Sequence, residues 1–406
     1  MKLINKYIMF ATLCFGSSLV FAQTSIPVYN ISTLLDMSIG SAFAKQNCPL
    51  LDGNYTCFIE GSARDIFDNL YVTTVLPKGQ IFKVTPSGQA SLYATFDTGN
   101  ENPLAMDENY ASFRVTIDVF EKLYVSFRAV DINQNPTDMN GIWSVPPGGG
   151  HCSLDSSNTC TKIFPAIGQT TNPIIGFPDS ILLDHQGNMY LADPQMGNIW
   201  KINLSTKNGT LWAGTDAGSN PNYLIGNPVD IVLGSPQSNR GFGIVGLAYD
   251  GLHNMLYGGT YDTGSVVAIP VMPDGSAGTQ SVSLNLSAND EQIEAVHIVN
   301  ESNGRKLLVG HTLTDFVGYA KYIGCQQGLP GFCPAPFVQP SYGQEILSAN
   351  LEDPAGLDFQ TLINDPQLKI PSSFVNGASD RDTLYINTLG QLDMSGSKIL
   401  KATQSR

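Results

Sequence analysis

Hydrophobic residues along the chain fall into short runs of strand length, divided by turns rich in Gly, Asp and Asn. Residues 178–202, PDSILLDHQGNMYLADPQMGNIWKI, show the pattern, with apolar runs on either side of the turns DHQGN and DPQMGN. Apolar runs this short, bounded by such turns, favour β-strands over helices. We therefore expect three consecutive short strands in this segment.

The same three-strand unit recurs six times along the chain. The second strand of each unit carries a short apolar run that usually contains a tyrosine: Leu70-Tyr71-Val72, Leu123-Tyr124-Val125, Met189-Tyr190-Leu191, Leu256-Tyr257-Gly258, Leu307-Leu308-Val309 and Leu384-Tyr385-Ile386. A third strand follows each of them: GQIFKV from Gly79, GIWSV from Gly141, GNIWKI from Gly197, GSVVAI from Gly264, QEILSA from Gln344 and SKILKA from Ser397.

Six repeated sheets of this size are typical of a β-propeller, because one blade cannot bury both faces of its sheet unless neighbours stack around an axis. A β-sandwich also contains many short strands, but it would not repeat one unit six times. We predict an all-β fold, a six-bladed β-propeller with disulfide-stapled loop insertions, formed by a single domain over residues 23–406. The early segment 25–32 is expected to supply an outer strand of the last blade.

The first 22 residues have the features of a cleaved signal peptide. Lys2 and Lys6 precede a short apolar stretch, and Val20-Phe21-Ala22 places small residues where signal peptidase reads them. The apolar stretch is shorter than a membrane anchor requires. We expect a secreted or periplasmic protein without membrane insertion.

Six of the seven cysteines form three closely spaced pairs: Cys48 with Cys57, Cys152 with Cys160, and Cys325 with Cys333. In an exported chain this spacing predicts three local disulfides, and none of the pairs has the C-x-x-C spacing of a zinc site. The first and third pairs should lie on the face where the inner strands begin. They could there form a rim or lid over the central channel, or simply decorate it.

The formal net charge is −14. An acidic surface argues against nucleic acids and anionic membranes as partners.

Three stretches resemble motifs of the gluconolactonase and senescence-marker-protein family, and more loosely those of strictosidine-synthase-like and NHL-repeat propellers. They are IEGSARDIFDNLYVTT (59–74), FPDSILLDHQGNMYLAD (177–193) and FVNGASDRDTLYINT (374–388). The resemblance implies a divalent cation, usually calcium, in the central channel, and hydrolysis of lactones. It assigns Glu60, Asp179 and Asn376 as metal ligands.

The spacing of the repeats supports two of these three residues independently. Glu60 lies ten residues before Leu70, and Asp179 ten residues before Met189, so the two acids share one blade position and should converge on the axis. Two carboxylates at one point repel each other unless a cation or a proton intervenes, and a hard cation such as calcium prefers oxygen ligands.

The other blades depart from the family pattern. The equivalent position is Phe113 or Ser112, next to Arg114, in the second blade, Gly246 in the fourth, and Glu294 or His297 in the fifth. For the family's catalytic aspartate, Asp230 is the available candidate.

Two functions therefore remain open. The first is a calcium-dependent hydrolase of lactones or related esters, in which the metal polarises the carbonyl and activates water. The second is a non-catalytic binding propeller that recognises a sugar, peptide or protein at the channel mouth. A histidine general base is a further possibility for the enzyme, with His297 as the residue that could approach the channel.

Overall fold

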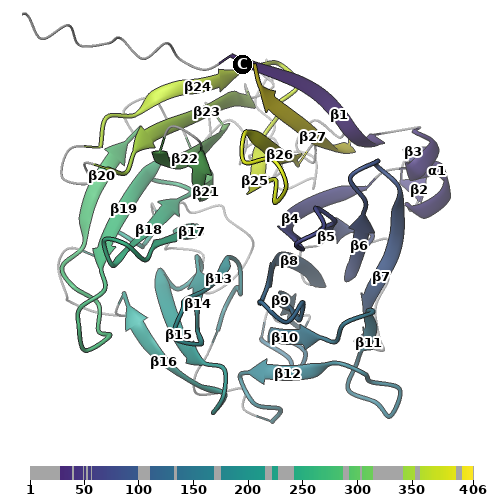
Figure 1. Ribbon diagram of the computed structural model, residues 1–406. Helices are drawn as coiled ribbons and strands as arrows, with labels where there is room; N and C mark the ends of the chain where they lie inside the picture. The colour runs from purple at the N-terminus through teal and green to yellow at the C-terminus, as the bar shows by residue number, and fades with distance from the viewer. Residues whose placement is uncertain are drawn as a thin grey trace, which may run out of the picture.

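Six twisted β-sheets are arranged around a central axis as the blades of a propeller, which confirms the predicted fold (Figure 1). The structure is a computed structural model. It describes residues 28–38, 41–48, 50–51, 54–55, 57–98, 110–131, 135–168, 175–214, 222–226, 242–286, 292–301, 304–313, 342–352, 357–389 and 396–405.

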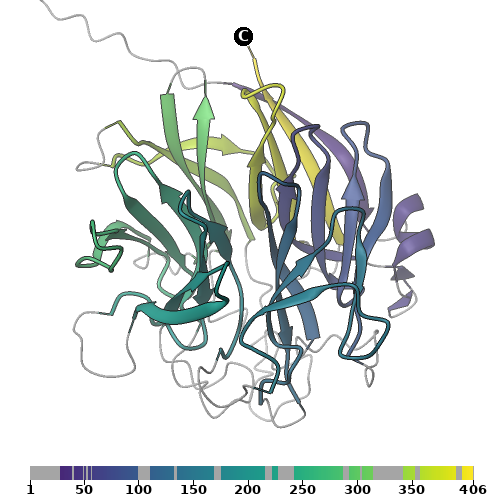
Figure 2. The same ribbon diagram turned by 60° about the horizontal axis from the view of Figure 1, so that its bottom comes forward.

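Each blade is an antiparallel sheet whose first strand is the innermost, and the inner strands run along the axis of the ring (Figure 2). Blade 1 contains β4 (Phe58–Arg64), β5 (Leu70–Leu76), β6 (Gln80–Val84) and β7 (Ala90–Phe96). Blade 2 contains β8 (Tyr110–Ile117), β9 (Leu123–Ala129), β10 (Gly141–Val145) and β12 (Thr161–Phe164). Blade 3 contains β13 (Ile181–Leu183), β14 (Asn188–Asp193), β15 (Asn198–Asn203) and β16 (Asn208–Ala213). Blade 4 contains β17 (Ile244–Asp250), β18 (Met255–Thr260), β19 (Ser265–Pro270) and β20 (Ser281–Asn285). Blade 5 contains β21 (Gln292–Glu301), β22 (Gly304–Leu313), β23 (Tyr342–Asn350) and β24 (Gln360–Asn364). Blade 6 contains β25 (Pro371–Asn376), β26 (Thr383–Thr388) and β27 (Gly396–Gln404).

The chain ends are joined through the last blade. The N-terminal strand β1 (Tyr29–Ser38) pairs antiparallel with β27, from Tyr29 opposite Gln404 to Ser38 opposite Gly396. The early segment thus supplies the outer strand of blade 6, as predicted, although the described strand begins and ends later than residues 25–32. A short helix α1 (Ala42–Asn47) and the hairpin of β2 (Leu50–Leu51) and β3 (Asn54–Tyr55) lead from β1 into blade 1.

Aspartates close the hairpins between the first and second strands of successive blades. The Asp65 carboxylate accepts hydrogen bonds from the Phe67 and Asn69 amides, both at 2.9 Å. Asp184 makes the equivalent contacts with the Gln186 and Asn188 amides, at 2.8 and 2.9 Å. Such side-chain acceptors stabilise tight turns. The repeated tyrosine of the second strand reaches the same group in blade 1, where the Tyr71 hydroxyl lies 3.3 Å from Asp65 Oδ2.

The hydrophobic core is divided into clusters that lie between neighbouring blades. One buried cluster joins Ile81 and Tyr71 of blade 1 to Trp143 and Phe127 of blade 2. Similar clusters link each of the other neighbouring pairs, including blades 6 and 1. Each sheet therefore buries its faces against the next one, which is the physical reason for the repeat.

Two of the three predicted disulfides are present, Cys48–Cys57 and Cys152–Cys160. Cys152 ends β11 (Gly150–Cys152), a strand from the blade 2 region that pairs in parallel with β7 and adds a fifth strand to blade 1. Cys325, Cys333 and the predicted signal peptide lie outside the described residues. Within the described part of the chain, no helix is long and apolar enough to span a membrane.

Candidate functional site

The inner strands carry β-bulges near the propeller axis. Pairing with the second strand shifts between Ile59 and Ser62 in β4, between Ser112 and Val115 in β8, and between Ile293 and Ala295 in β21. A bulge re-aims the side chains next to it. The residues inside these three bulges include Glu60, Arg114 and Glu294, and the side chains of these residues meet.

Arg114 is the centre of a buried ion cluster. Its Nη1 lies 3.1 Å from Glu60 Oε1, its Nη2 lies 3.2 Å from Glu294 Oε1, and its Nε lies 3.6 Å from Asp179 Oδ1. All four side chains are less than a tenth exposed. Since the acids belong to blades 1, 3 and 5 and the arginine to blade 2, one guanidinium links four blades at the axis.

The backbone around Arg114 is held closely. Its amide donates to Ser126 Oγ at 2.8 Å, and its Nη1 also donates to the Glu60 carbonyl oxygen at 3.1 Å. Gly61 permits this approach, because a Cβ added there would lie 2.6 Å from the Phe113 carbonyl oxygen and 2.8 Å from Arg114 Cα. The contact between blades 1 and 2 therefore requires glycine at position 61.

The surroundings of the cluster shift the pKa values of Glu60 and Arg114. Burial, together with the charge and hydrogen bond of the neighbouring Glu294, raises the pKa of Glu60 well above its usual value, although Arg114 acts in the opposite direction. Burial lowers the pKa of Arg114, but the three acids raise it by more. The guanidinium thus stays charged, and the cluster favours the neutral form of Glu60.

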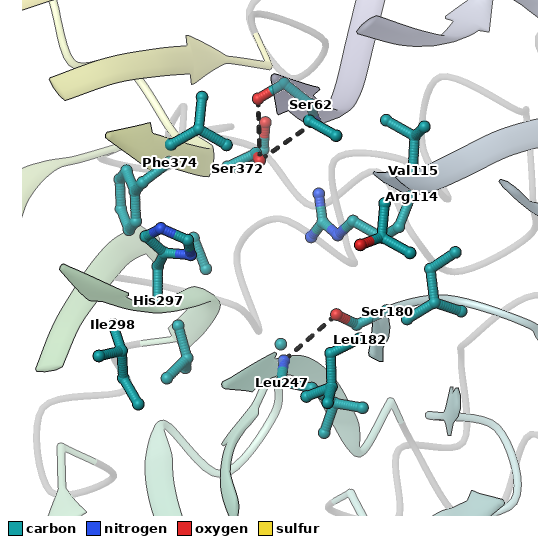
Figure 3. A pocket seen from close by; sticks show the side chains of 18 of the residues that line it. Ser62, Arg114, Val115, Ser180, Leu182, Leu247, His297, Ile298, Ser372 and Phe374 are labelled. Carbon is teal, nitrogen blue, oxygen red and sulfur yellow. Dashed lines mark hydrogen bonds between the residues drawn. The ribbon is translucent and has the colours of Figure 1, made fainter. Parts of the chain in front are cut away.

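A cavity of about 420 Å³ lies on one side of the cluster. It is lined by Arg114 and Glu294 and by the parts of the inner strands that follow the cluster residues, such as Ser62 to Arg64 in β4. The cavity therefore extends from Arg114 towards the turns at the ends of the inner strands. Arg114 and His297 face each other across it (Figure 3).

His297, Asn376 and Arg64 line the cavity from the adjacent blades 5, 6 and 1, and His297 is the one that faces Arg114. Burial and the charge of Arg64 together lower the pKa of His297 to about 4, although the interaction with the Asn376 side chain acts in the opposite direction. His297 is therefore neutral at pH 7 and can accept a proton. Among the described residues, no carboxylate lies within ion-pairing distance of Arg64.

The residues assigned as metal ligands lie in two places. Glu60 and Asp179 converge on the axis, but both contact Arg114, and Asn376 lies with His297 instead. Asp230 lies outside the described residues. The described part of the chain contains no group of three or more His, Cys, Asp or Glu side chains placed to hold a metal ion. Since a guanidinium already neutralises these carboxylates and would repel a second cation, this arrangement does not fit calcium. The metal assignment stays a prediction.

Sequence reasoning overlooked Arg114 as a site residue and left blade 5 open between Glu294 and His297. Both blade 5 residues contribute, Glu294 to the ion cluster and His297 to the cavity wall. The charge at position 114, beside the expected blade position 113, was the available signal. The bulge in β8 that turns Arg114 towards the acids was not visible in the sequence.

No protein-family model matches the chain, and no curated protein matches it by sequence. Solved structures do resemble it. A gluconolactonase from Xanthomonas campestris is 9% identical with a TM-score of 0.54, and the match covers 95% of this chain and 93% of that one. A luciferin-regenerating enzyme is 12% identical with a TM-score of 0.53, over 93% of this chain and 95% of that one. The PQQ-bound aldose sugar dehydrogenase of Streptomyces coelicolor is 13% identical with a TM-score of 0.51, over 93% and 99%. At these identities the likeness shows the fold alone.

Proposed function

We propose that this six-bladed propeller hydrolyses a lactone or related ester in its axial cavity, with His297 as general base. A gluconolactonase and other enzymes are among its structural neighbours. The observation that carries the proposal is that His297, Asn376 and Arg64 line the same cavity and interact electrostatically there. A volume of about 420 Å³ falls within the usual range for small-ligand pockets.

Each of the three residues has a chemical role in this reaction. His297 takes a proton from a water molecule as the water oxygen attacks the carbonyl carbon of the substrate. Asn376 holds the imidazole ring in one orientation. Arg64 stabilises the negative charge that develops on the carbonyl oxygen, and then the carboxylate of the product.

The step is balanced without a further reactant. The bond between the carbonyl carbon and the ring oxygen breaks, and the departing alkoxide takes the proton back from His297. The product is a hydroxy acid, which releases one proton to solvent at neutral pH. Arg114 does not act on the substrate in this scheme, because its guanidinium is engaged by three acids.

Proton release in a pH-stat, with a panel of γ- and δ-lactones and simple esters, tests the proposal. We expect His297→Gln to lower kcat/KM at least a hundredfold for any substrate that is turned over, since general-base catalysis commonly contributes two to four orders of magnitude, about 10²–10⁴. His185→Gln, in an exposed hairpin turn, is the matched control and should keep full activity. Equal activity in wild type and His297→Gln would overturn the role of His297.

Export is a separate proposal. Two disulfides support export, because such bonds persist in oxidising compartments. Calcium dependence rests on the sequence resemblance alone, and the Arg114 guanidinium between the three acids argues against it. Running the same assay with EDTA and with added calcium separates a metal-dependent reaction from one that uses only side chains.

A second candidate function is supported by a different observation. Apolar residues are exposed at the hairpin turns of blades 1 and 2, with Ile66 71%, Phe67 67%, Val119 92% and Phe120 82% exposed. These turns follow Arg64 and Ile117, which line the cavity. A binding propeller could use them to hold a protein or peptide. Ligand capture without turnover, lost in a Phe67→Ser, Phe120→Ser variant and kept in His297→Gln, would favour this function.

A further inference from the structure

We infer that the guanidinium of Arg114 is a built-in cation that takes the place of a metal ion at the propeller axis, and that Glu60, Asp179 and Glu294 form a latent calcium site which is released when Arg114 is removed. This inference is independent of the proposed hydrolysis, since it concerns what holds the axis together.

The geometry of the cluster supports the inference first. Three different nitrogens of one guanidinium contact three carboxylates from three different blades, at 3.1, 3.2 and 3.6 Å. A guanidinium is planar and holds its donors in fixed directions, so it can bind several carboxylates at once. The ammonium group of a lysine is a compact point charge and is less suited to this. Arg114 therefore connects blades through one central charge, which is what an axial metal ion would also do.

The charge of the cluster agrees with this geometry. Three buried carboxylates would be strongly destabilising without compensation. Arg114 supplies a positive charge at the point where the three carboxylates converge. Without Arg114 the acids lose this compensation, and calcium is a cation that carboxylate oxygens can hold in its place.

The site could accept calcium once the side chain of Arg114 is gone. Carboxylate oxygens are preferred calcium ligands, at about 2.3–2.6 Å, in a shell of about six to eight oxygens. The acids would move inward into the volume that the guanidinium vacates. The adjoining cavity, which is lined by Arg114 and Glu294, gives water access to complete the shell.

Thermal melting and isothermal titration calorimetry with calcium chloride test the inference. The wild type should show no change in Tm with calcium or EDTA and no calcium binding. Arg114→Ala should have a lowered Tm that calcium raises by several degrees and EDTA lowers again, with binding of one ion per chain. Adding Asp179→Asn to Arg114→Ala should weaken this binding at least tenfold.

Arg305→Ala is the matched control. Arg305 also pairs with buried carboxylate, that of Asp250, but it lies away from the axis. Loss of the Arg305 side chain should lower the Tm, and added calcium should not raise it again. If Arg114→Ala does not fold, Arg114→Met takes its place, because methionine fills more of the volume that the arginine leaves. This variant is refolded once with calcium and once with EDTA, and the yield of folded protein should depend on calcium. Calcium binding by the wild type, or no calcium response in either Arg114 variant, would overturn the inference. Because none of these readouts involves turnover, failure of the lactonase proposal leaves them unaffected.

Discussion

The Nη1 atom of Arg114 on β8 lies 3.1 Å from Oε1 of Glu60 on β4, and both side chains are almost completely buried. The two residues come from equivalent bulges in neighbouring blades. Arg114 stands one residue after the position equivalent to Glu60, so the two bulges bring opposite charges together at the axis.

Glu60→Gln should be tolerated, and Glu60→Ala should not. Because the cluster raises the pKa of Glu60 and so favours its neutral form, glutamine should accept from Arg114 and donate to Glu294 in the same way. We expect a change of less than about 1 kcal/mol in the free energy of unfolding for Glu60→Gln, and a loss of about 2–3 kcal/mol for Glu60→Ala, in urea denaturation at pH 7. Equal losses in the two variants would contradict the protonated state of Glu60.

The pH dependence of stability should follow the same proton. The folded-state pKa of Glu60 is raised, so the folded protein binds this proton more tightly than the unfolded chain. The contribution of this proton to the free energy of unfolding is present at low pH. It is lost as the pH rises from the usual pKa of glutamate towards the raised pKa of folded Glu60. Glu60→Gln should flatten this decline, measured as the difference between urea denaturation curves of variant and wild type.

His297 should give the opposite dependence. Its folded-state pKa is about 4, below the ordinary 6.5, so the unfolded chain binds the proton first as the pH falls. Stability should therefore decrease between pH 6.5 and pH 4, by roughly 3 kcal/mol. His297→Gln should lack this loss, whereas His185→Gln should retain it. Identical slopes for the wild type and His297→Gln would show that His297 is not buried in its neutral form.

Gly61→Ala should disturb the axis directly. The added Cβ would press on the backbone of Phe113 and Arg114, so we expect a loss of about 1–3 kcal/mol in the free energy of unfolding. At Gly187 an added Cβ meets nothing within 4 Å, although φ is +81°. Gly187→Ala should therefore cost only the backbone strain, about 1 kcal/mol. Equal costs would mean that the backbones at the axis can separate without penalty.

Removal of the second disulfide should weaken the join between blades 1 and 2. Cys152 and Cys160 are eight residues apart, and Cys152 ends the strand that extends blade 1. The loop-entropy relation gives a loss of about 2.5 kcal/mol for the Cys152→Ala, Cys160→Ala variant. Urea denaturation without reductant measures it. An unchanged midpoint would show that the hydrogen bonds between β11 and β7 hold this strand without the covalent link.

The fold was predictable from the sequence because each blade is formed by the same local pattern of strands and turns. The apolar strand runs, the turn aspartates and the six anchors, five of which contain a tyrosine, recur along the chain with the blades. Counting back from these anchors located Glu60 and Asp179 on the axis, because the hairpins of blades 1 and 3 keep that spacing.

The same count failed in blades 2 and 5. Blade 2 keeps the register of blade 1, but there the side chain that reaches the acids is Arg114, one residue after the counted position. In blade 5 a longer hairpin places Glu294 three residues before the counted position. Bulges depend on pairing between strands and leave no pattern in a single sequence. His297 and Asn376 lie on the neighbouring blades 5 and 6, so no spacing within one blade could have predicted that they interact.

The pairing of β1 with β27 makes the first described strand of the chain depend on the last described one. Until residues 396–404 are available, β1 has no partner and blade 6 has an open edge. A ribosome-bound chain can assemble separate blades but cannot close the circle. Premature termination near the C-terminus should thus be far more damaging than its small length suggests, leaving two unpaired strand edges that favour aggregation.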